Sequence, residues 1–196
     1  MKFEHDKSWD NFEMIFNLRL PIKDAWNRII DFYENTSPNT YWTLLRELDV
    51  ENEQNEIKSW LEHIATNSPI SDSVVALWIG LTKLVHNDKE IYASYLIGAD
   101  TYDKDNIDWA TEPTYEPENR YVALDILNQM DSIIKEGDQD YYSFLDWILP
   151  LAYCALTIDE IIRTKLDKTI FLKLKPKLFV ATGHDSGDYM NLSPIE

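Results

Sequence analysis

Residues 141–166 form the longest apolar stretch of the sequence, and they limit what the chain can fold into. Their apolar side chains recur at steps of three and four, and also fill the opposite side of the predicted helix. A helix that is hydrophobic on nearly every side is typical of a buried core element. Asp146, Asp159 and Glu160 interrupt the run, which therefore lacks the roughly 18 apolar residues of a membrane span. Pro150 predicts a kink, or two helices that meet there.

The first third of the chain is predicted to be mainly helical. Apolar residues recur at helical spacing in residues 22–33, 40–49 and 51–64. Residues 11–20 fit two patterns, because alternation from Phe12 to Leu20 indicates a strand, whereas the spacing of Trp9, Phe12 and Phe16 fits a capped helix. Between these alternatives we favour a strand.

Two hairpins are predicted in the remaining sequence. Residues 74–85 also fit a helix, but the polar break at residues 86–88 and the aromatic and β-branched residues after it favour a hairpin over 74–99. A second hairpin is expected at about 178–192, around a tight turn that contains Gly187. The basic stretch before it alternates Lys with Leu at 172–178, which indicates a charged strand near a sheet edge.

These elements predict an α+β fold in one domain, residues 1–196. We expect helices packed on an antiparallel sheet built from the two hairpins, about 74–99 and 178–192, with the buried apolar helix at about 141–166. A further helix is expected from Glu118 to Gly137. The length of 196 residues is sufficient for one sizeable core.

The charge of the chain restricts its partners. With 35 acidic and 18 basic residues the net charge is −17, which argues against nucleic acid or an anionic membrane and favours a basic protein partner. The single cysteine, Cys154, cannot form an internal disulfide, and the N-terminal segment has no apolar signal core. We therefore expect a cytoplasmic protein, whose oligomeric state the sequence leaves open.

The long acidic connection at residues 98–117 is the first candidate site. Its acids at 103, 105 and 108 suggest a calcium loop, but the fifth and sixth positions are Ile107 and Asp108 instead of an oxygen donor and glycine. A solvated loop is the simplest interpretation, and a protein-binding surface is the functional one, since aromatic residues lie among the acids. The candidate partner-binding residues are Asp100, Asp103, Asp105, Asp108, Trp109, Glu112, Tyr115 and Glu116.

The cluster His184, Asp185, Ser186, Gly187 and Asp188 is the second candidate site. His184, Asp185 and Asp188 fit the ligands of a metal-assisted hydrolase, but Asp, Ser and Gly are also what a hairpin turn requires, and we favour the turn. No two histidines have the spacing of a helical metal site, so neither a metal nor a cofactor is expected.

Catalytic motifs are absent from the sequence. There is no phosphate-binding glycine loop, dinucleotide fingerprint or nucleophile elbow. Cys154 lies among apolar residues, which suppress the reactivity of a thiol. We therefore do not expect an enzyme.

The middle and end of the chain resemble a known group of proteins. The hairpin VVALWIGL and IYASYLIGAD, the segment IDWATEPTYEPENRY, two helices and the late VATGHDSGD together resemble small bacterial proteins of the polymorphic-toxin immunity type, over roughly residues 74–192. This resemblance implies a non-catalytic protein that binds and neutralises a toxin. The alternatives are the metal-assisted hydrolase at His184, Asp185 and Asp188 and a structural subunit of an assembly.

Overall fold

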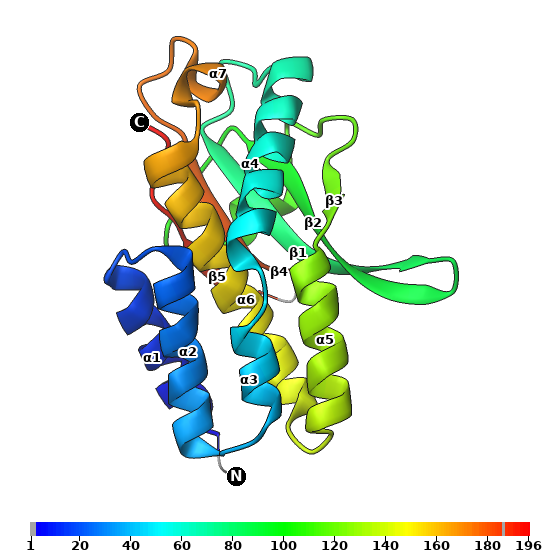
Figure 1. The fold of residues 1–196 in the computed structure, drawn as a ribbon. Helices are drawn as coiled ribbons and strands as arrows, with labels where there is room; N and C mark the ends of the chain where they lie inside the picture. Colours follow the sequence, from blue (N-terminus) through cyan, green and yellow to red (C-terminus); the bar gives the residue numbers. More distant parts are fainter. Residues whose placement is uncertain (1–2, 186) are drawn as a thin grey trace.

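The computed structural model describes residues 3–185 and 187–196, and its fold is α+β, as predicted (Figure 1). The α-helices are α1 (His5–Asn17), α2 (Ile22–Thr36), α3 (Tyr41–Arg46), α4 (Val50–Asn67), α5 (Asp125–Gly137), α6 (Tyr142–Glu160) and α7 (Lys168–Leu172). The strands are β1 (Ala76–His86), β2 (Lys89–Ala99), β3 (Tyr121–Ala123), β4 (Phe179–His184) and β5 (Tyr189–Asn191). A 3-10 helix, η1 (Ile107–Thr111), and a π-helix, η2 (Ile161–Lys165), complete the elements.

The strands form one sheet in the order β3-β2-β1-β4-β5. Both predicted hairpins are present, since β1 pairs antiparallel with β2 and β4 pairs antiparallel with β5. Asn87 and Asp88 connect β1 to β2 with positive φ angles of 50° and 60°, the conformation that a two-residue turn of type I′ requires. The hairpins join through β1 and β4, which run parallel from Ala76↔Phe179 to Leu81↔His184.

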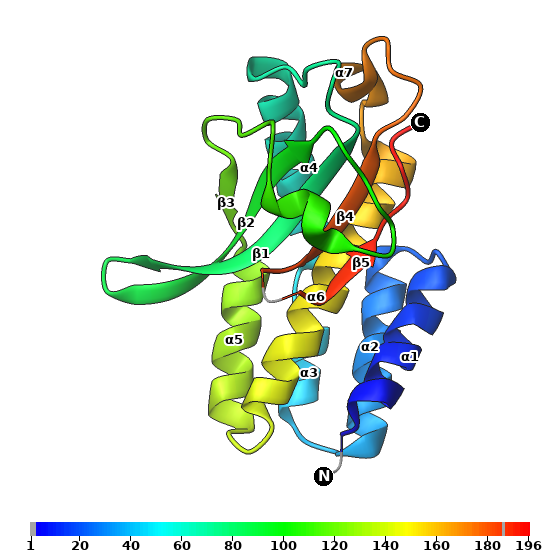
Figure 2. The ribbon, with the colours of Figure 1, turned by 180° about the vertical axis from the view of Figure 1, so that it is seen from behind.

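The two faces of the sheet are covered differently. Helices cover one face, and the connection from β2 to β3 crosses the other (Figures 1 and 2). Strand residues alternate between these faces, so that Leu77, Ile79 and Leu81 join the large core under the helices. Trp78 and Ile97 join a smaller apolar cluster under the connection. The sheet therefore separates a large core from a small one.

The predicted core helix is α6, which is confirmed as the most buried helix of the fold. Fourteen of its 19 residues are buried, including Ile148 and Leu151. Pro150 lies inside α6 and does not divide it into two helices. The π-helix η2 directly follows α6 and buries Ile161 and Ile162. The contacts of α6 with α1, α2, α4, α5 and β4 place it at the centre of the helical layer.

The preference for a strand at residues 11–20 is wrong, because this segment forms most of α1. The helix buries Phe12, Ile15 and Phe16 on one side and leaves Met14 57% exposed on the other. Both patterns share Phe12 and Phe16, and the helical one prevails because it buries Ile15 as well.

Two other local predictions need correction. The helix expected from Glu118 begins at Asp125, and residues 121–123 before it form β3, which pairs with the edge of β2. The basic stretch forms α7 and a turn, in which the Lys175 amide donates to the Leu172 carbonyl, instead of an edge strand. Leu174 in this turn is 93% exposed, so the alternation of Lys and Leu does not reflect burial on a sheet.

Among the residues described, none of the helices is both long and apolar enough to cross a membrane.

Candidate functional site

The predicted partner-binding residues lie on the connection between β2 and β3, which spreads over the sheet face opposite the helices (Figure 2). Its middle is η1. The residue before this helix, Asn106, caps it, because its side chain accepts a hydrogen bond from the Asp108 amide. Asp103 accepts in the same way from the Asp105 amide at 2.9 Å. These local side-chain bonds fold the acidic loop into successive turns. We refer to residues 100–118 as the acidic loop.

The aromatic residues of the acidic loop fasten it to the sheet. Trp109 is 7% exposed and packs edge-on against Trp78 with ring centroids 6.5 Å apart. Tyr102 stacks on Phe179 at 4.1 Å. Tyr115 is 9% exposed, and its hydroxyl donates to the Ser68 carbonyl. The two aromatic residues expected to contact a partner, Trp109 and Tyr115, are therefore structural anchors in the free protein.

Backbone and strand side chains also hold the acidic loop. The Gly98 amide donates to the Tyr115 carbonyl at 2.9 Å, and the Tyr115 amide donates back to Gly98 at 3.0 Å. Asn191 and Tyr189 of β5 both donate to the Lys104 carbonyl, at 2.9 and 3.1 Å. Contacts at both ends and in the middle fix the backbone of this segment, in contrast to a solvated connection without tertiary contacts.

The six predicted acids of the acidic loop are all exposed: Asp100, Asp103, Asp105, Asp108, Glu112 and Glu116. Glu116 pairs with Arg120 at 3.1 Å, and Asp105 lies 3.9 Å from Lys104. Within residues 3–185 and 187–196, the other four carboxylates form no ion pair with a basic side chain. They are therefore available to a positively charged group from outside.

Those four carboxylates border a common hollow of about 590 Å³. Its lining also includes the aromatic residues Tyr102 and Trp109. The indole nitrogen of Trp109 is buried and has no hydrogen-bond partner among the described residues. Burial raises the pKa of Tyr102, and the neighbouring Tyr189 and the carboxylates of Asp103 and Asp105 raise it further. The structure thus brings four of the predicted acids together beside the aromatic side chains of Tyr102 and Trp109.

The second candidate cluster is the turn between β4 and β5. His184 Nε2 lies 2.8 Å from the Trp147 carbonyl and carries the proton of this bond, because a carbonyl oxygen only accepts. Asp188 accepts from the Trp147 indole at 2.8 Å, and Asp185 accepts from the Tyr95 hydroxyl. His184 and Asp188 thus both bond to Trp147, one to its carbonyl and the other to its indole, whereas Asp185 bonds to Tyr95.

This arrangement does not form a metal centre. Throughout the described part of the chain, no group of three His, Cys, Asp or Glu side chains converges as metal ligands. Ser186, which belonged to the predicted cluster, lies outside the described residues. Gly187 has a φ of +120°, the positive value expected of a glycine in a tight turn. The backbone conformation of Gly187 therefore agrees with the prediction of a hairpin turn between β4 and β5.

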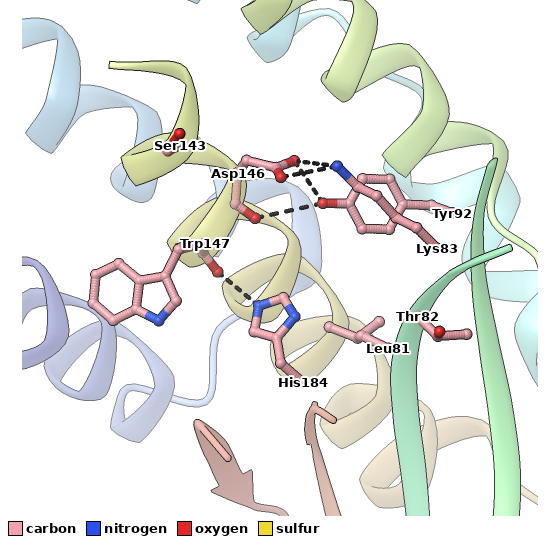
Figure 3. A pocket seen from close by; sticks show the side chains of 8 residues that line it. All are labelled: Leu81, Thr82, Lys83, Tyr92, Ser143, Asp146, Trp147 and His184. Atoms are coloured by element: carbon pink, nitrogen blue, oxygen red, sulfur yellow. Dashed lines mark hydrogen bonds and ion pairs between the residues drawn. The ribbon is translucent and has the colours of Figure 1, made fainter. Parts of the chain in front are cut away.

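A pocket of about 280 Å³ lies beside this turn on the helix face (Figure 3). Lys83 on β1 contacts Asp146 of α6 at 2.8 Å and Asp131 of α5 at 3.2 Å. The Tyr92 hydroxyl donates to the same Asp146 carboxylate at 2.6 Å. His184 lines the opposite side of the pocket and points its Nε2 at Trp147.

The charged groups of this pocket form ion pairs and hydrogen bonds with one another. Burial lowers the pKa of Lys83, but the Asp146 and Asp131 carboxylates outweigh burial and raise it above its usual value. Burial and the Asp146 carboxylate together raise the pKa of Tyr92. A protonated lysine and a protonated phenol beside a fully bonded carboxylate provide no general base and no activated nucleophile. The cluster ties β1 to α5 and α6.

No pattern in the sequence predicts this ion-pair cluster. Lys83 lies 48 positions before Asp131 and 63 positions before Asp146, so no local motif joins these residues. The one available signal is Asp146 itself, because a charged residue in a largely buried helix requires a partner.

Comparisons with protein-family models, with curated protein sequences and with solved structures give no match to this chain.

Proposed function

We propose that the chain is a non-catalytic binding protein that captures a basic protein through the acidic loop. The observation that carries this proposal is the combination of a fixed backbone with free carboxylates. Trp109 and Tyr115 anchor the acidic loop on the sheet, while Asp100, Asp103 and Asp108 remain exposed without ion pairs among the described residues. A surface ordered before binding loses less conformational entropy when a partner arrives.

Charge complementarity defines the partner. A protein of net charge −17 attracts positive surfaces over a distance of about one Debye length, roughly 8–10 Å at physiological salt. Lysine or arginine side chains of a partner fit the hollow of about 590 Å³, where carboxylates and aromatic rings lie together. The resemblance to immunity proteins would make this partner a toxin.

Co-purification with matched variants tests the proposal. The loop variant replaces Asp100, Asp103 and Asp108 by Asn and Glu112 by Gln. A control variant removes the same number of carboxylates from exposed positions away from the loop: Glu47→Gln, Glu51→Gln, Glu56→Gln and Glu136→Gln. From an extract of the native host, the tagged chain and the control are expected to retain a basic protein that the loop variant loses.

Equal retention by the two variants would show that net charge, and not the acidic loop, holds the partner. Retention of an acidic protein, with no basic one, would contradict the proposed charge complementarity. We do not propose the metal-assisted hydrolase, because His184 and Asp188 bond to Trp147 and Asp185 bonds to Tyr95, and the three side chains do not converge as metal ligands among the described residues.

A further inference from the structure

A small hollow lies between the turn that joins β4 to β5, the acidic loop and the sheet face that this loop crosses, which we call the loop face. The hollow has a volume of about 180 Å³. Pockets for small-molecule ligands usually have about 300–1,000 Å³, so this one has the size for a single side chain. The residues that border it include Trp78, Tyr95, Ile107, Ala110, Thr111 and Asp185.

Two glycines let aromatic rings lie across the sheet beside this hollow. Gly80 of β1 pairs with Tyr95 of β2 on one side and with Gly183 of β4 on the other. A Cβ atom at Gly80 would overlap the Tyr95 ring, and one at Gly183 would overlap the Trp78 ring. The two rings meet where the Trp78 indole donates to the Tyr95 hydroxyl at 3.1 Å. The sheet thus presents two joined aromatic side chains to the hollow.

Asp185 adds a carboxylate that has no basic partner. The residue is exposed, and its carboxylate accepts a hydrogen bond from the Tyr95 hydroxyl. Burial and the Asp185 carboxylate raise the pKa of Tyr95, so its hydroxyl stays protonated and keeps the carboxylate in place. Arg120 borders a neighbouring hollow together with Asp185 but pairs with Glu116 at 3.1 Å. Within residues 3–185 and 187–196, Asp185 therefore forms no ion pair with a basic side chain.

On the basis of the function proposed above, we propose that this hollow binds the side chain of one arginine of the basic partner. The guanidinium group pairs with Asp185, and the aliphatic part of the side chain contacts Ile107 and Ala110. Arginine fits better than lysine, because a guanidinium group is less strongly hydrated than an ammonium group and stacks on aromatic rings. Thr111 borders both this hollow and the hollow of about 590 Å³, so a partner bound to the acidic loop reaches Asp185 directly.

A capped amino acid tests the site without the partner. The probe is N-acetyl-arginine amide, whose one charge is its guanidinium group. In NMR spectra of the isotope-labelled full chain at low salt, this probe is expected to shift the indole signal of Trp78, which reports on the bond to Tyr95. N-acetyl-citrulline amide has nearly the same shape without the charge and is expected to leave the signal in place. N-acetyl-lysine amide is expected to bind more weakly than the arginine probe.

Three variants separate the charge of the site from its shape. Asp185→Asn keeps an oxygen that accepts from Tyr95 but removes the charge, and it should raise the dissociation constant of the arginine probe about tenfold. Ala110→Leu fills the hollow without changing a charge and should weaken binding as well. Asp140→Asn removes an exposed carboxylate elsewhere and should bind the probe like the wild type. Equal melting temperatures of Asp185→Asn and the wild type would show that the fold is retained.

Co-purification from the native host distinguishes this site from the proposed function. Asp185→Asn is expected to retain less of the basic partner than Asp140→Asn does. If the loop variant loses the partner and Asp185→Asn retains all of it, the proposed function stands and the arginine site is overturned. If the wild type retains no basic protein but binds the arginine probe at Asp185, the site stands and the proposed function fails. Equal binding of the arginine and citrulline probes, or equal binding of the arginine probe by Asp185→Asn and the wild type, would also overturn the site.

Discussion

The two faces of the sheet use charged residues in opposite ways. On the helix face, Asp159 is buried and bonds to Arg19, Arg163 and the Ser193 amide. Glu53 is buried as well and accepts from the Tyr153 hydroxyl and the Ile126 amide, where it caps the start of α5. On the loop face, aromatic residues make the internal contacts and the carboxylates face solvent.

This difference separates a face whose charged groups hold the fold together from a face whose carboxylates are exposed, as the proposed binding function requires. Carboxylates bonded within the helix face hold elements together, and removing one leaves donors without partners. Carboxylates on the acidic loop bond only to nearby residues, as Asp103 does to the Asp105 amide and Glu116 does to Arg120, so we expect the fold to tolerate changes there. The comparison predicts that substitutions on the helix face change the free energy of unfolding, whereas loop carboxylates change association.

The largest effect is expected in α6. Leu151→Ala removes a fully buried side chain from the centre of the helical layer and should cost about 2–5 kcal/mol of unfolding free energy. Leu174→Ala, the same change at a 93% exposed position, is the control and should cost less than about 0.5 kcal/mol. Denaturant titration measures both, and equal stabilities would remove α6 as the principal core element.

Trp109→Ala tests the small core under the acidic loop. Loss of a buried indole costs about 3 kcal/mol or more in a protein core, and here we expect the lower end because the cluster is small. Amide exchange should accelerate in residues 100–118 while α6 stays protected. Uniform acceleration over the whole chain would show that the two cores unfold as one, and the comparison between faces would fail.

Asp159→Asn tests the buried ion pair on the helix face. Burial raises the pKa of Asp159, but bonds from Arg19, the Ser193 amide and Arg163 outweigh it and hold the pKa below its usual value. The ionised carboxylate therefore stabilises the fold above the pKa of the unfolded chain, and this contribution is lost as the pH falls through the folded pKa. The substitution should cost about 1–3 kcal/mol at neutral pH.

The cost of Asp159→Asn should shrink below about pH 4, where the carboxylate of the unfolded chain begins to protonate. Asp140→Asn, at an exposed position, is the control for a lost charge and should leave the pH profile unchanged. A cost that stays constant down to pH 2 would show that the ion pair does not contribute.

The sequence was sufficient to predict elements with local signals. Residues 141–166 carry an unambiguous apolar period, and the β1–β2 hairpin has a polar break, Asn87 and Asp88, between residues of high β-propensity. Strand β3 was missed because its three residues have no period of their own and are ordered by pairing with β2. The parallel contact between β1 and β4 is equally non-local.

The candidate site was predictable in part. Acidic residues in a long connection were expected to face solvent, and Asp103 and Asp108 do so. The burial of Trp109 and Tyr115 was not predictable, because aromatic residues in a segment without periodicity indicate neither a partner nor a sheet beneath them. Their position depends on tertiary contacts with Trp78 on β1 and with Ser68 at the end of α4.

The smallest effect on stability is expected for the double variant Asp103→Asn with Asp105→Asn. Both carboxylates are exposed, so the free energy of unfolding should change by less than about 0.5 kcal/mol. Association with the proposed basic partner should nevertheless slow and become less sensitive to salt, because these charges act during encounter. Stopped-flow association rates at two ionic strengths measure this, with Glu47→Gln and Glu51→Gln as the control for lost charge. Equal rates for both double variants would mean that the acidic loop does not guide the partner, while a destabilised protein would mean that its carboxylates hold the fold as those of the helix face do.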